Sequence, residues 1–190
     1  MQENFLFRSG VRRRDRGRMP HWETSDASYF VTFRLRDSLP TEVVVRLMHE
    51  RSRMLAKTTN YAQKMEVNRA FGRWLDTFLD RGHGSSILRQ HGGVVAETLK
   101  HFDGKRYELQ AWCVMPNHVH VLLYVSGVAR LDRILHSWKS YTAHAIGLGR
   151  IWAREYFDHI VRGADEMERI SDYIRNNPLR ARLRDWPFIG

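Results

Sequence analysis

The sequence predicts an α+β fold, in which an antiparallel sheet is covered by helices on one face. Runs rich in β-branched and aromatic residues, which are typical of strands, stand at residues 29–33, 107–115 and 118–125. Apolar residues recur at helical spacing in other segments, at residues 42–80, 86–101, 131–146 and 165–177. The order of one strand, helices, two strands and further helices favours an antiparallel sheet, because strands and helices do not strictly alternate.

The segment between the first two predicted strands is expected to be helical. Its first part, residues 42–80, has Thr41 as the expected cap. The polar run Thr58–Asn60 is expected to divide this part into two helices. A further helix is expected over residues 86–101, although the Gly92-Gly93 pair is unfavourable inside a helix.

The second half of the chain contains two predicted strands and two predicted helices. Pro116-Asn117 interrupts the apolar sequence between the two strands. Residues 151–161 are rich in aromatic side chains but irregular, and no regular element is expected there. The last helix is expected to have Asp165 as its cap and to end at Asn177, with Pro178 just beyond its end.

Composition limits the classes of function that this chain can have. The 190 residues, 43% of them hydrophobic, suit one domain with its own core. The formal net charge of +10 favours a polyanionic partner such as nucleic acid, and a basic protein without such a partner is the alternative. The single cysteine, Cys113, excludes an internal disulfide framework and a cysteine-rich zinc site, and it suits a reducing cytosol.

The sequence also bears on the location of the protein. It contains no run of about 18 apolar residues, so no membrane span is expected. The Phe5–Phe7 run is too short for the apolar region of a signal peptide, and a basic segment follows it. We therefore expect a cytoplasmic protein.

That basic segment, residues 8–18, is rich in arginine, and Asp15 is its only acidic residue. A solvated tail and a phosphate-binding arm are both compatible with such a run. In the second interpretation, an arm over about residues 1–20 contacts DNA phosphates through Arg12, Arg13, Arg14, Arg16 and Arg18.

His118 and His120 lie two residues apart on a predicted strand. The period of two in a strand places both imidazoles on one face and Val119 and Val121 on the other. Neutral imidazole is a common metal ligand, so the pair is a candidate metal site. The pair alone is a weak signal, because the chain has ten histidines, and exposed or core histidines are the alternative.

The last predicted helix carries a second group of candidate residues. Ile170, Tyr173, Ile174 and Asn177 have the i, i+3, i+4, i+7 spacing of one helix face. One interpretation makes Tyr173 a core aromatic and Asn177 a cap before Pro178. In the other, the carbonyl oxygen of Asn177 completes a metal site with the two imidazoles, and the Tyr173 hydroxyl lies beside it.

A tyrosine beside a metal ion suits attack on a phosphodiester. The phenol has a pKa near 10 and is a poor nucleophile until it loses its proton. A divalent cation on the scissile phosphate withdraws charge and makes the attack easier. The phosphotyrosyl bond then conserves the energy of the broken bond, and the sequence contains no phosphate-binding loop of the Walker type.

Several segments resemble one family of enzymes. Trp112–Leu123 resembles the histidine-hydrophobic-histidine (HUH) segment of the single-tyrosine, IS200-like transposases, and Asp172–Pro178 resembles their catalytic helix. Phe157–Arg162 and Asp185–Phe188 resemble flanking segments of the REP-associated tyrosine transposases, a branch that bacterial hosts often keep as single chromosomal copies.

This resemblance covers residues 20–40 and about 107–188, and it implies a fold and a domain organisation. The implied fold is a ferredoxin-like α+β sandwich, forming a single domain over residues 1–190. A helical insertion over about residues 42–102 is longer than in compact relatives.

The resemblance also implies roles for individual residues. Tyr173 matches the nucleophile, His118 and His120 match the metal-binding pair, and Asn177 matches the third ligand. The implied reaction cleaves single-stranded DNA with Mg²⁺ or Mn²⁺ and leaves a 5′-phosphotyrosine and a free 3′-hydroxyl. The implied substrates are REP palindromes that form hairpins, and a bacterial protein of this kind acts at the nucleoid.

Other residues near these motifs have two interpretations each. Lys139 is a phosphate contact or a solvated lysine, and His159 and Arg162 are candidates for contact with the scissile region. Tyr141 is the rival nucleophile, but it extends the apolar stripe of its helix and is therefore expected to pack.

Two further classes of function stay open at this stage. One is a non-catalytic single-stranded nucleic-acid-binding or regulatory protein that retains the fold, and the other is a metal nuclease that uses water. The intact set of tyrosine, histidine pair and asparagine favours the strand-transferring enzyme, because binding alone needs none of them. Mobile relatives are homodimers and the REP branch includes monomers, so both states stay open.

Overall fold

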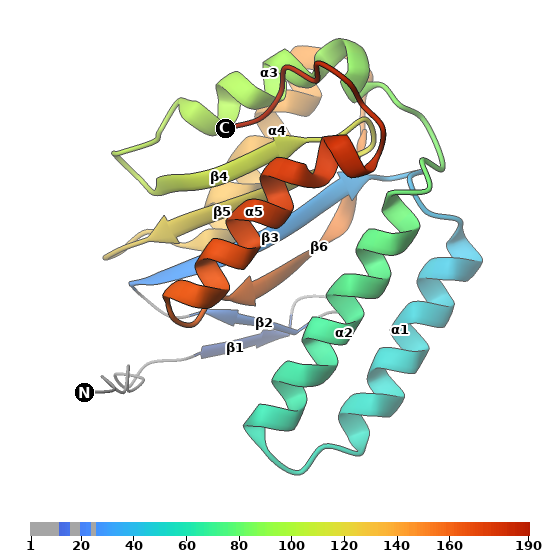
Figure 1. The fold of residues 1–190 in the computed structure, drawn as a ribbon, viewed down its shortest axis with the longest axis vertical. Helices are drawn as coiled ribbons and strands as arrows, with labels where there is room; N and C mark the ends of the chain where they lie inside the picture. Colours follow the sequence, from blue (N-terminus) through green and yellow to red (C-terminus); the bar gives the residue numbers. More distant parts are fainter. Residues whose placement is uncertain (1–11, 16–19, 24–25) are drawn as a thin grey trace.

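A computed structural model describes residues 12–15, 20–23 and 26–190 (Figure 1). Its main sheet has four antiparallel strands in the spatial order β4-β5-β3-β6. These strands are β3 (Ala27–Leu35), β4 (Glu108–Val114), β5 (His118–Val125) and β6 (Trp152–Ile160). The helices of the described residues are α1 (Thr41–Ala56), α2 (Tyr61–Leu79), α3 (Leu88–Lys100), α4 (Leu131–Ile146) and α5 (Ala164–Arg180).

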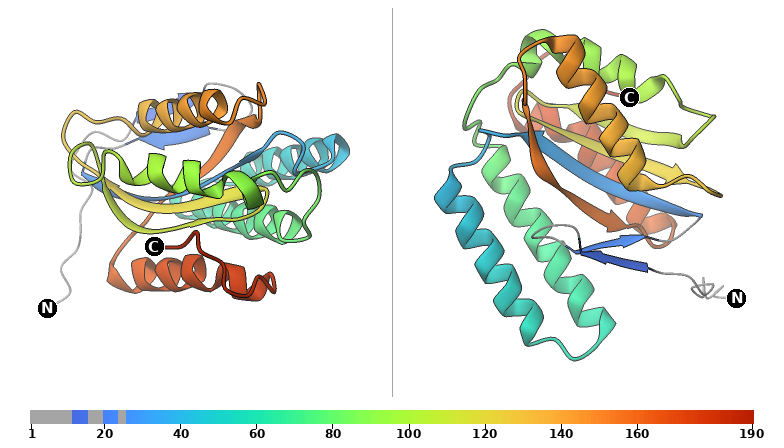
Figure 2. Two further views of the ribbon diagram at one scale, coloured as in Figure 1. Left: turned by 90° about the horizontal axis from the view of Figure 1, so that it is seen from above. Right: turned by 180° about the vertical axis from the view of Figure 1, so that it is seen from behind.

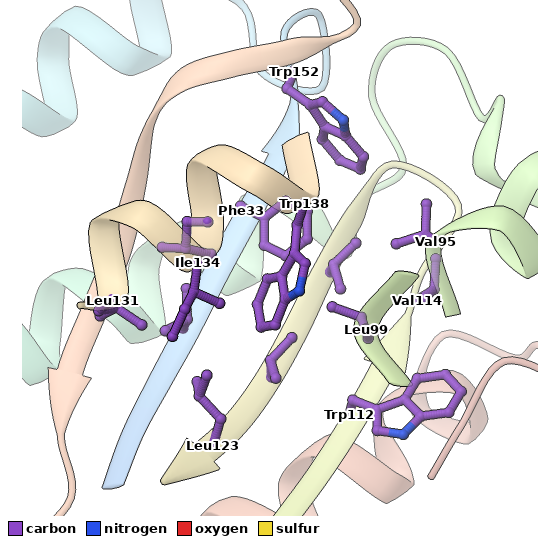
Figure 3. Close-up of a cluster of buried hydrophobic side chains, with 14 of the residues drawn as sticks. Phe33, Val95, Leu99, Trp112, Val114, Leu123, Leu131, Ile134, Trp138 and Trp152 are labelled. Atoms are coloured by element: carbon purple, nitrogen blue, oxygen red, sulfur yellow. The ribbon is translucent and has the colours of Figure 1, made fainter. Parts of the chain in front are cut away.

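The chain order and the strand order together define a ferredoxin-like core, which confirms the predicted fold class. Helix α3 lies between β3 and β4 in the chain, α4 lies between β5 and β6, and both helices cover the same face of the sheet (Figure 2). The core on this face joins Phe33 and Leu123 of the sheet to Leu99 of α3 and Trp138 of α4 (Figure 3). The Trp138 indole donates a hydrogen bond to the Tyr107 hydroxyl at 3.0 Å.

Helix α5 lies on the opposite face of the sheet, together with part of α2 (Figure 2). The core there joins Phe30, Leu122 and Phe157 of the sheet to Phe71 of α2 and Ile174 of α5. The prediction of helices on one face is correct for α3 and α4 and wrong for α5. Helix α5 follows the complete ferredoxin-like unit, and it covers sheet side chains that would otherwise face water.

Residues 151–161, which were expected to be irregular, contain strand β6. This strand pairs with β3, and a register shift falls between Phe33 and Leu35. A bulge of this kind changes the face that each following side chain takes. The alternation of apolar and polar residues is therefore broken, which explains why the sequence pattern does not reveal the strand.

Two helices have ends that differ from the prediction. Helix α1 begins at Thr41 after Pro40, so Thr41 is not a cap but the first helical residue. Helix α5 begins after Gly163, and Asp165 lies in its first turn, where a negative charge is favourable. Pro178 lies inside α5, because a proline in the last turn removes only one backbone hydrogen bond.

The helical insertion is also shorter than residues 42–102. Helices α1 and α2 form a hairpin that extends from the sheet (Figure 1), whereas α3 belongs to the ferredoxin-like core. The Asn60 side chain accepts a hydrogen bond from the Gln63 N–H at 2.9 Å and so caps α2. A Cβ atom on Gly92 of α3 would lie 2.4 Å from the Phe188 ring, which explains a glycine inside this helix.

Part of the predicted basic arm forms a β-hairpin. Strand β1 (Arg12–Asp15) pairs antiparallel with β2 (Pro20–Glu23), and β2 contacts β6. Residues 12–15 and 20–23 of this segment thus have regular structure, while Arg16 and Arg18 lie outside the described residues. No helix among residues 26–190 is long and apolar enough to cross a membrane.

Candidate active site

His118 and His120 lie side by side on β5, on the face of the sheet that α5 covers. Both imidazoles are buried, and their Nε2 atoms are 3.0 Å apart. Val119 and Val121 point into the core on the other face, as the period of two predicts. The structure thus brings the predicted pair together on one face.

The orientation of the His118 ring is fixed by Asn117. The Asn117 amide nitrogen donates hydrogen bonds to the carbonyl oxygens of Leu79 (3.2 Å) and His83 (3.1 Å). Its amide oxygen therefore faces the imidazole, where His118 Nδ1–H donates to it at 2.7 Å. Since the ring is neutral with its proton on Nδ1, Nε2 carries a lone pair that faces His120.

The His120 ring is held in a similar way. Its Nδ1 lies 2.9 Å from the Thr32 hydroxyl, which can donate or accept and so suits either tautomer. The Phe30 ring stacks on the imidazole with 5.5 Å between centroids. Burial lowers the pKa of His118 to about 3, and burial together with His118 lowers the pKa of His120. Both rings are thus kept in the neutral form that binds metal ions.

Asn177 lies on α5 and is buried, as the predicted third ligand should be. Neither its amide oxygen nor its amide nitrogen has a hydrogen-bond partner among the described residues. A buried amide without hydrogen-bond partners costs free energy in a protein interior, so its presence indicates that a ligand binds to it. Together, two neutral imidazoles and an amide oxygen would make a mixed nitrogen and oxygen donor set of the kind that suits a divalent cation.

Histidine, cysteine and carboxylate residues alone do not make a metal site here. Within the part of the chain that the structure describes, no group of three or more such side chains is placed to hold a metal ion. A metal site built on the histidine pair therefore needs a ligand of another type, and the Asn177 amide is available.

Tyr173 lies one helical turn before Asn177, and its ring centroid is 5.4 Å from that of His120. Its hydroxyl is buried without a hydrogen bond of good geometry in the described structure. Burial raises the pKa of the phenol, and the negative charges of Asp76 and Asp80 raise it further, while Arg180 opposes the rise. The phenol is therefore protonated at rest.

The Tyr173 hydroxyl lies close to Asp76 of α2, which lines the same cleft and which the sequence did not single out. Burial raises the pKa of Asp76 to about 7, the phenol contact opposes this rise, and Asp80 adds to it. Nothing in the local sequence distinguishes Asp76 from a solvated residue of an amphipathic helix. Its role becomes visible only when α2 and α5 are placed against each other.

A cleft of about 360 Å³ opens between α2, α5 and the end of the sheet. Its lining includes Tyr173, Asp76, Arg69 and His159. His159 Nε2 lies 3.1 Å from the Glu166 carboxylate, whereas its Nδ1 is buried without a partner in the described structure. The predicted contact residue His159 is thus at the cleft beside the phenol.

Arg162 is hydrogen-bonded to Glu166, which lines this cleft. The Arg162 N–H donates to the Glu166 carboxylate at 2.8 Å, and Arg69 forms an ion pair with the same carboxylate at 2.9 Å. Burial raises the pKa of Glu166, but the bonds from His159 and Arg162, with the Arg69 charge, lower it to about 2. The network holds the β6–α5 connection beside the site.

Lys139 and Tyr141 lie elsewhere, on α4 at the other face of the sheet. The Lys139 ammonium donates to the carbonyl oxygens of Ala153 (2.6 Å) and Arg154 (3.0 Å), and burial lowers its pKa to about 8. Tyr141 is 61% exposed, so the expectation that it packs into the core is wrong. Neither residue lines the Tyr173 cleft.

Comparisons with known proteins agree with this arrangement. Residues 87–177 match the family model described as IS200-like transposase. A REP-associated tyrosine transposase of Escherichia coli (strain K12) is 28% identical over 123 residues, which cover 62% of this chain and 74% of the relative.

A solved structure, that of a REP-associated tyrosine transposase bound to a REP hairpin, has the same fold. The TM-score is 0.58 at 18% identity, over 89% of this chain and 79% of that chain. The match to the IS200-like family model covers residues 87–177, the part of this chain that contains His118, His120, Tyr173 and Asn177.

Proposed function

We propose that this protein cleaves and rejoins single-stranded DNA at hairpin-forming repeats, with Tyr173 as the nucleophile. One observation carries the proposal: the Tyr173 ring lies 5.4 Å from the ring of His120, whose Nε2 is 3.0 Å from that of His118. A phenol and two neutral imidazoles thus meet on one buried face, between a strand and a helix that hold them rigidly.

His118, His120 and Asn177 are the residues that would hold Mg²⁺ or Mn²⁺. The cation, when bound, neutralises charge on the scissile phosphate. Asn117 and Thr32 orient the two imidazoles, and the surrounding core excludes water from them.

In the proposed reaction, the oxygen of Tyr173 attacks phosphorus in line with the leaving 3′-oxygen. The O–H bond of the phenol and the P–O3′ bond break, and a Tyr173–phosphorus ester forms at the 5′ end of the cleaved strand. The 3′-oxygen leaves as a hydroxyl. The reverse attack of a 3′-hydroxyl on the phosphotyrosine rejoins the strand, and no nucleotide cofactor is consumed.

The charge of the protein suits this substrate. The formal net charge is +10, and Arg69, Arg73 and Arg169 line the cleft beside Tyr173. Strand β1 adds the positive residues Arg12, Arg13 and Arg14 to the chain, and its partner β2 contacts β6. The related structure with a REP hairpin supports a folded single strand as the ligand class.

Trapping the covalent intermediate tests this function. Incubation of the wild-type protein with a 5′- and 3′-labelled hairpin oligonucleotide and Mn²⁺ should give labelled protein after denaturation. Tyr173→Phe keeps the ring and should bind the hairpin without forming the adduct. Tyr141→Phe, which changes an exposed phenol on the other face of the sheet, is the matched control and should form the adduct at the wild-type rate.

The outcomes separate the candidate functions. Adduct formation by Tyr173→Phe would exclude Tyr173 as the nucleophile. Cleavage by the wild-type protein without any adduct would favour a nuclease that uses water. Binding without cleavage, with all divalent cations tried, would favour a regulatory DNA-binding protein.

A further inference from the structure

Helix α2, which belongs to the inserted hairpin, places a carboxylate against the proposed nucleophile. Asp76 and Tyr173 line the same cleft, one from α2 and the other from α5. The phenol oxygen and Oδ1 of Asp76 are both buried, and both lack a hydrogen-bond partner in the described structure. The carboxylate and the phenol are thus left to interact with each other.

The other acids near the phenol are less suited to accept its proton. Glu166 is already bound by His159, Arg69 and the Arg162 N–H, which together stabilise its charged form. Asp80 lies just beyond the last residue of α2 at an exposed position; partial burial raises its pKa, and the charge of Arg180 opposes this rise. Asp76 is the acid beside the hydroxyl whose charge no such cation stabilises.

We propose that Asp76 takes the phenolic proton from Tyr173 during strand cleavage and returns it during strand joining. The O–H bond of the phenol breaks, its electron pair forms the bond to phosphorus, and the proton moves to Asp76. The P–O3′ bond breaks, and the 3′-oxygen takes a proton from water. This inference rests on the proposed function, in which Tyr173 is the nucleophile.

The environment of Asp76 suits both directions of this transfer. Burial raises its pKa to about 7, close to neutral pH, where a group can both accept and release a proton. The other titratable and charged groups that face this cleft or the phenol are Glu66, Arg69, Arg73, Asp80, His120, His159, Glu166, Arg169 and Arg180. The charges of these groups influence the free energy of the proton transfer. The transfer itself requires an acceptor beside the hydroxyl.

The test measures the single-turnover rate of adduct formation between pH 5.5 and 9, at saturating Mn²⁺ and hairpin DNA. Wild-type protein should show a rate that rises with pH and levels off, because Asp76 must be charged to accept the proton. Asp76→Asn should lower the rate about 10²–10⁴-fold and abolish this rise. Asp80→Asn, just beyond the end of α2, is the control: it should keep a rate that rises with pH and levels off, with the midpoint moved to lower pH because the Asp80 charge raises the pKa of Asp76.

Two further measurements exclude other roles of Asp76. Hairpin affinity and the Mn²⁺ concentration at half-maximal rate should be unchanged in Asp76→Asn, since Asp76 is proposed neither as a DNA contact nor as a metal ligand. Excess Mn²⁺ that restores the rate would overturn the proposal. A melting temperature at pH 8 at or above that of wild type shows that the rate loss does not come from unfolding.

A modified substrate distinguishes attack from departure. A 3′-bridging phosphorothiolate has a sulfur leaving group that needs no proton. The defect of Asp76→Asn should persist on this substrate, because the phenol still has to lose its proton. Recovery to the wild-type rate would overturn the proposal, since Asp76 would then protonate the leaving oxygen.

Failure of this inference is separable from failure of the proposed function. If wild-type protein forms the adduct and Asp76→Asn does so with the wild-type rate and pH profile, only the role of Asp76 is overturned. If wild-type protein forms no adduct, both are overturned.

Discussion

The amide oxygen of Asn117 lies 2.7 Å from Nδ1 of His118, and the amide nitrogen of Asn117 is already bound to two backbone carbonyl groups. The amide therefore cannot flip without losing both of those hydrogen bonds. It fixes the proton of His118 on Nδ1 and leaves Nε2 as a ligand atom. A residue outside the proposed ligand set thus determines the state of a ligand.

Substitution of Asn117 should weaken metal binding. We expect Asn117→Ala to lower Mn²⁺ affinity about 10–100-fold, because outer partners of metal-bound histidines have effects of this size. The free energy of unfolding should fall by about 1–3 kcal/mol, because one buried and one partly buried carbonyl group lose their donor. Titration of Mn²⁺ followed by electron paramagnetic resonance measures the affinity. Unchanged affinity in a folded variant would show that Asn117 does not act through His118.

Asn177 should be needed for metal binding and not for the fold. Asn177→Leu replaces a buried amide, without partners in the described structure, by an apolar group of similar size. The melting temperature should therefore stay the same or rise, while the Mn²⁺ requirement for adduct formation increases at least tenfold. Asn176→Leu, at an exposed position of the same helix, is the control for both measurements. A large loss of stability in Asn177→Leu would favour a structural role.

Glu166 should stabilise the protein in a pH-dependent way. Its pKa is about 2 in the folded protein and 4.5 in its ordinary state, so its contribution is complete above about pH 4.5 and is lost as the pH falls towards 2. Glu166→Gln should lower the free energy of unfolding at pH 7 by about 1–2 kcal/mol. The difference from wild type should shrink in urea titrations repeated at pH 4, 3 and 2.5. Glu168→Gln changes an exposed carboxylate of the same helix and should show no such difference at any pH.

The basic N-terminal segment should strengthen DNA binding through phosphates. Replacing Arg12, Arg13, Arg14, Arg16 and Arg18 together by glutamine should weaken single-strand binding and flatten its dependence on salt. The slope of log affinity against log salt should fall by about 0.7 for every phosphate that these side chains neutralise in the wild-type complex. Fluorescence anisotropy over roughly 50 to 300 mM NaCl measures both the affinity and the slope. Equal affinity and equal slope would show that these arginines do not touch the strand.

Much of the fold follows from local patterns in the sequence. Strand β5 and helix α4 have the bounds that alternation and helical spacing predict, residues 118–125 and 131–146. Strand β6 does not follow from such patterns, because the register shift between Phe33 and Leu35 breaks its alternation. The position of α5 on the opposite face also depends on packing that no local pattern contains.

Part of the candidate site also follows from local sequence patterns, and the rest depends on tertiary packing. Its histidine pair and the Tyr173–Asn177 face follow from strand and helix periods, so the sequence alone predicts which side chains share a surface. Asp76 is almost 100 positions from Tyr173 in the chain, and the contact between them depends on how α2 docks. Asn117 stands beside the histidines in the sequence, but its role depends on the carbonyl groups that end α2 and follow it.

The hairpin of α1 and α2 therefore cannot be replaced without changing the surroundings of the candidate site. The chain leaving α2 provides the two carbonyl groups that hold Asn117, and α2 itself carries Asp76. A chimera that takes the hairpin of a relative would alter the ligand environment and the nucleophile environment at once. Variation in this insertion is thus coupled to variation in the ferredoxin-like unit, and the two are expected to diversify together rather than as separate modules.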